Sequence, residues 1–229
     1  MLVLIPAVLS TDDVASLRAA LDGAGNAWVD GRVTAGHQGA AVKHNQQLAE
    51  DSALARELGD RIVARLERHA RFISAALPDR VYPPMFNRYA TGNAFGSHVD
   101  NAVRLVPGTR GQKLRTDLSA TLFLCEPEDY DGGELHIDDG DAAQSVKLAA
   151  GDLVLYPSTH LHRVNPVTRG VRLACFFWVQ SMVRDPAQRR LLLELDEASQ
   201  RLAGTAGDER TRAQLLNCYH NLLRMWSTV

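Results

Sequence analysis

Hydrophobic positions change their spacing along the chain, and the first stretch has the spacing of helices. A short apolar run at 2–5 precedes a polar cluster at 10–13, after which apolar residues recur every three or four positions. A longer helical pattern covers about 49–76 and is closed by prolines at 78 and 83–84. We expect a first strand followed by two N-terminal helices, while residues 24–48 between them show no clear period.

From about residue 85 the pattern changes to short apolar or alternating segments separated by Gly, Asp and Pro. These segments cover residues 85–90, 118–125, 134–137, 145–148, 152–157 and 171–180. Many short strands at close spacing are typical of an all-β sandwich, jelly roll or barrel. Asp185-Pro186 then resembles a helix start, and two amphipathic patterns follow at 186–203 and about 208–226. The pattern predicts helices, a β core and a helical tail.

Composition is that of an ordinary globular protein, with 229 residues, 45% hydrophobic and 23% charged. Lys and Arg number 25 against 27 Asp and Glu, which gives no bias toward nucleic acid or an anionic membrane. The N-terminal apolar run is broken by Pro6, far short of the roughly 20 residues that span a bilayer. We expect a cytoplasmic protein with neither a nucleic-acid nor a membrane partner. Its three cysteines argue against a disulfide framework, and Cys125 and Cys175 lie in apolar runs, which favours core positions over metal binding.

Candidate chemistry begins with His98 and Asp100, which are separated by one residue. In a strand, side chains two residues apart point to the same face, so this pair could share one metal ion. Two histidines and one carboxylate form the facial triad of non-heme iron(II) oxygenases. The alternative is that His-x-Asp occurs here by chance, with His98 near a surface turn.

A third ligand would come from another strand, and the sequence leaves several candidates open. His160 and His162 follow a buried strand and share the same parity, so either could face inward. His136 is a more remote candidate. Taken singly, each is more often a half-exposed histidine than a ligand.

Arg172 lies ten residues after His162, inside an apolar strand. An arginine in such a strand is expensive to bury without an anionic partner. Its guanidinium suits bidentate binding of a carboxylate, such as the distal carboxylate of 2-oxoglutarate. Alternatively, Arg172 could face solvent or pair with an internal Asp or Glu.

The chain resembles the PKHD-type hydroxylases, a bacterial branch of the prolyl-4-hydroxylase-like Fe(II)/2-oxoglutarate dioxygenases. The resemblance covers nearly the whole chain, and its motifs are long and specific. The matching segments are 87–89 with Gly92, 96–100, 115–124, 129–135, 151–157, 161–164 with 166–167, and 170–184.

The resemblance implies a double-stranded β-helix (jelly-roll) core in an α+β fold, with an oxygenase domain at 1–182 and a helical extension at 183–229. It implies that His98, Asp100 and His162 bind Fe(II), and that Arg172 binds 2-oxoglutarate. Tyr89 matches a position whose hydroxyl often supports this co-substrate. His160 stands where a small polar residue is expected, and would be a neighbour of the ligands or a competitor for the metal.

The resemblance further implies that O2 and 2-oxoglutarate are consumed, a C–H bond is hydroxylated and succinate is released, with L-ascorbate maintaining the iron. The substrate would be a small molecule or a peptide. Basic residues in the Gly-containing loop expected between Asp100 and Leu118 indicate an anionic substrate, or are ordinary charges of a solvated loop. Three alternatives remain: a cupin-type oxygenase that needs no 2-oxoglutarate, a metal-dependent binding or sensing domain on a jelly roll, and a β-sandwich interaction module with incidental histidines. The oligomeric state is not predicted.

Overall fold

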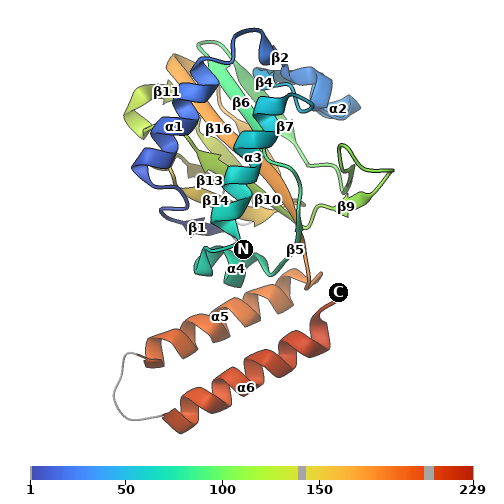
Figure 1. Cartoon of the computed structure of the whole chain (residues 1–229), viewed down its shortest axis with the longest axis vertical. Helices are drawn as coiled ribbons and strands as arrows, with labels where there is room; N and C mark the ends of the chain where they lie inside the picture. The colour runs from blue at the N-terminus through green and yellow to red at the C-terminus, as the bar shows by residue number, and fades with distance from the viewer. Residues whose placement is uncertain (1, 139–142, 204–208, 229) are drawn as a thin grey trace.

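The computed structural model describes residues 2–138, 143–203 and 209–228. Its centre consists of two antiparallel sheets that enclose a cavity, with helices at the N-terminal and C-terminal ends of the chain (Figure 1). This arrangement confirms the predicted α+β fold with a jelly-roll core. Most predicted strand segments form strands, because their alternating apolar residues bury one face of a sheet.

The larger sheet has the order β1-β14-β10-β16-β6-β4-β2, with β5 and β11 also paired to β16. Its strands are β1 (Val3–Ile5), β2 (Trp28–Asp30), β4 (Gln46–Leu48), β5 (Pro78–Val81), β6 (Met85–Ala90), β10 (Leu118–Phe123), β11 (Tyr130–Gly132), β14 (Leu153–Pro157) and β16 (Val167–Ser181). The strand β16 is the long central member, and it carries Arg172 between β10 and β6.

The smaller sheet has the order β13-β12-β15-β7-β3. Its strands are β3 (Lys43–His44), β7 (Ala94–His98), β12 (Leu135–Asp138), β13 (Ala143–Val146) and β15 (Leu161–Val164). Between β7 and β10, the basic segment expected to be a loop forms a hairpin of β8 (Val103–Leu105) and β9 (Lys113–Arg115), which projects from the barrel (Figure 1).

Helices α1 (Thr11–Asp22), α3 (Ala53–Leu66) and α4 (Ala70–Ala76) belong to the N-terminal part of the chain, and α1 begins with a capping box between Ser10 and Asp13. The prediction of one helix over 49–76 is wrong. Helix α3 ends at Leu66, and His69 adopts an extended conformation and accepts a hydrogen bond from the Phe72 amide, so it caps the start of a separate helix, α4. Segment 24–48, which showed no clear period, lies between α1 and α3. Besides the short strands β2, β3 and β4, it contains the helical turns η1 (Gly25–Ala27), η2 (Gly31–Thr34) and α2 (His37–Ala40). A further turn, η3 (Pro127–Asp129), precedes β11.

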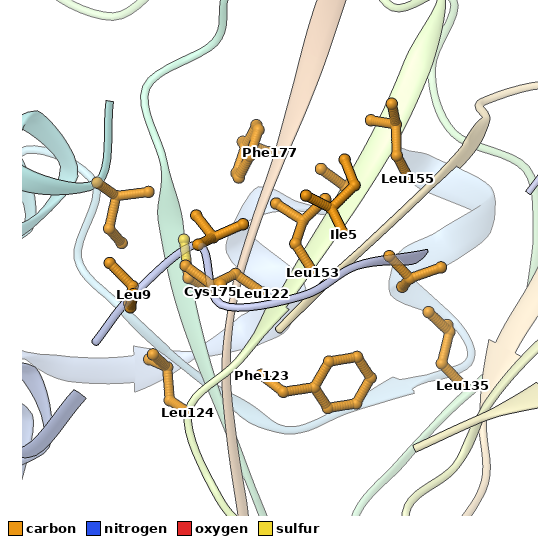
Figure 2. Packing of buried hydrophobic residues seen from close by; sticks show 14 of the residues in the cluster. Ile5, Leu9, Leu122, Phe123, Leu124, Leu135, Leu153, Leu155, Cys175 and Phe177 are labelled. Carbon is orange, nitrogen blue, oxygen red and sulfur yellow. The ribbon is translucent and has the colours of Figure 1, made fainter. Parts of the chain in front are cut away.

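The hydrophobic core lies beside the larger sheet and joins it to the N-terminal segment. Figure 2 shows Ile5 beside Leu153 and Leu155, with Leu122, Cys175 and Phe177 in the same cluster. These side chains are at most 1% exposed. Cys175 is therefore a core residue, as expected from its apolar surroundings.

Helices α5 (Pro186–Ala203) and α6 (Glu209–Trp226) form an antiparallel pair that lies next to α4 (Figure 1). Asp185 caps α5 by accepting hydrogen bonds from the amides of Ala187 and Gln188, as the Asp-Pro pair predicted. Residue 208, included in the predicted second helix, lies outside the described residues. Within the described part of the chain, no helix is long and apolar enough to cross a membrane.

Candidate active site

Two adjacent strands of the smaller sheet bring His98 and His162 together. The two residues are register partners between β7 and β15, and their ring centroids are 4.2 Å apart. Asp100 lies just beyond the end of β7, with its Oδ2 atom 3.6 Å from Nε2 of His162. One potential ligand atom from each residue lies within 4.8 Å of the others. We call this group the His98–Asp100–His162 cluster.

Backbone carbonyls orient both imidazole rings. Nδ1 of His98 lies 2.8 Å from the Gly96 carbonyl, and Nδ1 of His162 lies 3.0 Å from the His160 carbonyl. A carbonyl only accepts, so each Nδ1 carries the proton and the Nε2 of each neutral ring keeps its lone pair. Burial, followed by the proximity of His162, lowers the pKa of His98. The neutral form favoured in this way is the one that binds metals.

The Asp100 carboxylate is held by a short chain of hydroxyl groups. Ser119 on β10 donates from Oγ to Asp100 Oδ2 over 2.6 Å, and its Oγ is 2.7 Å from that of Ser158. Both serines are nearly fully buried. The chain therefore orients the carboxylate from behind, as outer partners of metal ligands commonly do.

Arg172 is deeply buried in the same cavity. Its side chain is only 1% exposed, and its guanidinium lies 5.4 Å from the ring centroids of both Tyr89 and Phe123. Its Nε and Nη1 atoms have no hydrogen-bond partner, and it joins no ion pair among the described residues. Neither sequence-based alternative, a solvent-facing arginine or one paired with an internal acid, describes this position. The geometry leaves a buried cation with donors available for an anionic ligand.

Tyr89 is the register partner of Arg172 across β6 and β16. Burial raises the pKa of Tyr89 to about 12, so its hydroxyl remains protonated at neutral pH. The cavity that both residues line has a volume of about 630 Å³ and reaches the His98–Asp100–His162 cluster. This size suits a small molecule beside a bound co-substrate.

The other candidate histidines are not part of the cluster. His136 lies on β12 opposite Arg163, and its Nε2 is 2.8 Å from Nδ2 of Asn165. His160 lies in the turn before β15 and contributes its backbone carbonyl to His162. Strand alternation allowed either His160 or His162 to face inward, and in the structure His162 lines the cavity.

Several residues that shape the site had no distinguishing signal in the sequence. Ser119 and Ser158 are common residue types in ordinary strand contexts, and Lys43 falls in the segment without a clear period. Phe95, which stacks on His98 at a centroid distance of 3.6 Å, resembles any strand phenylalanine. Their roles depend on which strands become neighbours.

Comparisons with known proteins agree with this geometry. Residues 84–180 match the 2OG-Fe(II) oxygenase superfamily, and residues 186–228 match the PKHD-type hydroxylase C-terminal domain. A PKHD-type hydroxylase of Paraburkholderia phymatum is 62% identical over 227 residues, covering 99% of each chain. Another, from Stutzerimonas stutzeri, is 56% identical over the full length of both chains.

The chain belongs to the PKHD-type hydroxylases. It is therefore an Fe(II)- and 2-oxoglutarate-dependent dioxygenase that hydroxylates a C–H bond while 2-oxoglutarate is decarboxylated to succinate.

Solved structures share the fold of this PKHD-type hydroxylase at low sequence identity. A Pseudomonas putida prolyl-4-hydroxylase is 21% identical, with a TM-score of 0.52 over 79% of this chain and 92% of its own. A prolyl hydroxylase from Trichoplax adhaerens, solved with a hypoxia inducible factor peptide, is 16% identical with a TM-score of 0.53 over 83% and 86%. A carbocyclase from nogalamycin biosynthesis is 17% identical with a TM-score of 0.56 over 80% of each chain.

The donor set of the PKHD-type hydroxylase fits the cofactors of its family. Two imidazoles and one carboxylate on one side of a cavity match the facial donor set of iron(II) oxygenases. The unpartnered guanidinium atoms of Arg172 match the charge and fork geometry of a carboxylate.

Proposed function

We propose that His98, Asp100 and His162 bind the catalytic Fe(II), and that Arg172 and Tyr89 bind the distal carboxylate of 2-oxoglutarate. The observation that carries this proposal is the convergence of three ligand atoms within 4.8 Å at the wall of an open cavity. When bound, Fe(II) and 2-oxoglutarate would supply electrons that activate O2 for oxidation of a C–H bond.

The residues of the chain hold and orient these groups. The imidazoles present their Nε2 lone pairs because the carbonyls of Gly96 and His160 hold Nδ1–H. Ser119 keeps the Asp100 carboxylate turned toward the histidines. Arg172 offers unpartnered N–H groups from a side chain that is only 1% exposed, where a charge-assisted hydrogen bond is strong.

The test is the visible spectrum of the oxygen-free protein as Fe(II) and then 2-oxoglutarate are added. A metal-to-ligand charge-transfer band is expected in the wild type, absent in His162→Ala and formed only at much higher 2-oxoglutarate concentration in Arg172→Ala.

Two variants serve as matched controls. His136→Ala removes a histidine outside the cluster, and Arg169→Ala removes an exposed arginine from β16, the strand that carries Arg172. Both should retain the band. A wild-type protein that binds iron but gives no band would favour a cupin-type or sensing role and contradict the assignment.

We also propose that L-ascorbate sustains turnover by keeping the iron reduced. The support is the family membership, since such enzymes lose reduced iron in turnovers without substrate. Succinate release followed over many turnovers should slow early without ascorbate and continue with it. Identical time courses with and without ascorbate would contradict this role.

We further propose that residues 1–182 form the oxygenase domain and 183–229 a helical extension. The proposal is supported by the end of β16 at Ser181 and the start of α5 at Pro186, with separate family models matching on either side. O2 and a small-molecule or peptide substrate are the partners that we propose for the oxygenase domain.

A further inference from the structure

Lys43 is a buried cation in the active-site cavity that binding of iron and 2-oxoglutarate leaves unused. It lies on β3 with only 4% exposure, and its Nζ donates to Gln47 Oε1 over 3.0 Å and to Thr34 Oγ1 over 3.1 Å. An ammonium group has three donors, so one remains. Lys43 joins no ion pair with any described residue, although burial of a charge normally requires one.

Arg104 is a second cation on the wall of the same cavity. It lies on β8 of the projecting hairpin, and its guanidinium covers Trp178 at 4.3 Å and Tyr82 at 5.0 Å from the ring centroids. Its nearest carboxylate is that of Glu50, 3.9 Å away, and its Nε has no hydrogen-bond partner. A single long ion pair leaves most of its donor capacity available.

The two cations lie away from Arg172 along the cavity. Alternation on β16 places Arg172, Phe176 and Trp178 on one face, and all three line the cavity. Arg172 and Phe176 are four positions apart on β16, which places them about 13 Å apart along the strand at a rise of ~3.3 Å per residue. The Lys43 ammonium lies 5.7 Å from the Phe176 ring, and Arg104 lies on Trp178. The five-carbon co-substrate held at Arg172 would not reach both cations.

Charge balance separates the two regions as well. Fe(II), the 2-oxoglutarate dianion, Asp100 and Arg172 together sum to zero. Lys43 and Arg104 then face the Glu50 carboxylate, while Asp30, which also acts on Lys43, is already paired with Arg32, so this part of the cavity keeps a net positive charge. An anionic group of the substrate would neutralise it.

We propose that Lys43 and Arg104 bind the anionic group of the primary substrate, a small organic acid or phosphate ester whose apolar body lies against Phe176 and Trp178. This inference rests on the proposed function, because it assumes that Arg172 is occupied by 2-oxoglutarate. Lys43 also lies 5.3 Å from the ring centroid of Phe95, which stacks on His98. An anion bound there holds the rest of the substrate beside the cluster.

The test uses the oxygen-free protein loaded with Fe(II) and 2-oxoglutarate, titrated with benzoate, phenyl phosphate and the neutral benzamide. Binding is measured by calorimetry while the charge-transfer band reports that 2-oxoglutarate stays in place. At least one anion should bind roughly tenfold or more tightly than benzamide, as expected for a charge-assisted contact. Whichever anion binds more tightly, benzoate or phenyl phosphate, identifies the carboxylate or the phosphate as the preferred group.

In Lys43→Met and Arg104→Gln the preference should fall below about threefold, with the affinity for 2-oxoglutarate unchanged within about twofold. Arg104 lies on the projecting hairpin, so its variant tests the idea even where Lys43→Met fails to fold. Lys113→Met, on the same hairpin and exposed, is the matched control and should keep the preference.

Equal binding of the three probes, or a preference retained in both variants, would overturn the inference while the band leaves the iron and 2-oxoglutarate assignment intact. Loss of an anion's affinity together with loss of the band would show that the anion competes at Arg172, which also overturns it. Absence of the band in the wild type before any probe is added would instead refute the proposed function and this inference with it.

Discussion

At the scale of single residues, Arg172 lowers the stability of the ligand-free protein but prepares the site to bind its ligand. Its cation is buried between two aromatic rings with two nitrogen atoms, Nε and Nη1, that lack hydrogen-bond partners, which is unfavourable in the protein without ligands. The same feature prepares the cavity for a carboxylate, because no internal acid has to be displaced. Sites of this kind commonly trade folding free energy for binding.

Replacing Arg172 by Met should therefore raise the free energy of unfolding of the ligand-free protein by about 1–3 kcal/mol, since the charge is removed and the volume is nearly kept. The affinity for 2-oxoglutarate should fall by about tenfold or more. Thermal unfolding and anaerobic titration measure the two effects. Arg169→Met, exposed on the same strand, should leave the affinity unchanged; a strongly destabilised Arg172→Met would mean that the guanidinium has a stabilising partner.

The lowered pKa of Lys43 predicts that anion binding depends on pH. Burial, with a further contribution from Arg104, lowers the pKa of Lys43 to about 8, against the opposing effects of Glu50, Asp100 and Asp30. In the folded protein the ammonium is present below pH 8 and is lost above it, whereas an unfolded lysine stays charged to about pH 10.4.

The affinity for an anionic probe such as benzoate should be full below pH 8 and decline above it by up to about tenfold per pH unit. A bound anion favours the ammonium, so the complex itself deprotonates at higher pH. Calorimetry between pH 7 and about 9.5 checks this, with Lys43→Met expected to show a flat profile. A wild-type profile as flat as that of the variant would contradict a role for the ammonium.

At the scale of elements, β16 determines where Arg172 lies. Next to its N-terminal end, Gly170 has a φ of +73° and faces the Asp129 carbonyl, which a Cβ atom would approach to 2.2 Å. Only glycine suits this close approach of backbone to backbone, which pairs β11 with β16 two residues before Arg172.

Gly170→Ala should lower the free energy of unfolding by about 3 kcal/mol or more, from the left-handed backbone and the clash together. Gly108→Ala in the hairpin is a matched control with the same φ of +73° and no atom within 4 Å of the added Cβ, and should lose only about 1 kcal/mol. Chemical denaturation of both variants makes the comparison. Equal losses would show that the contact with Asp129 is unimportant.

At the scale of the whole molecule, α5 joins the C-terminal helices to the rest of the fold. Leu192 is fully buried in a cluster with Leu77 and Val183, against which Tyr219 and Trp226 of α6 pack. Leu77 ends α4 and Val183 follows β16, so this cluster links three parts of the chain. The apolar faces of α5 and α6 thus meet each other and the barrel end.

Leu192→Ala should lower the free energy of unfolding by about 3 kcal/mol, because it leaves a cavity where three segments meet. Its neighbour Leu191 is 54% exposed, so Leu191→Ala should change stability by less than about 0.5 kcal/mol. Thermal or denaturant unfolding of the pair decides the point. A similar small effect in both variants would mean that the C-terminal helices are only loosely attached.

The sequence by itself determined the local features of this protein. Period-two alternation identified the core strands, and the Asp185-Pro186 pair located the start of α5. Arg172 within an apolar strand predicted a carboxylate-binding position, with a solvent-facing or internally paired arginine as alternatives, and the binding role stays a prediction. The break at His69 was missed because it depends on a side-chain cap rather than on the apolar period, which continues through it.

Only the tertiary structure decided which distant residues meet. Parity allowed both His160 and His162 to face inward, and only the resemblance to a family selected His162; the pairing of β15 with β7 gives the physical reason, because it places His162 opposite His98. The same holds for Lys43, whose position follows from the pairing of β3 with β7. Alternation along one strand specifies which face a side chain takes, but not which strand becomes its neighbour, since that depends on the packing of the whole core.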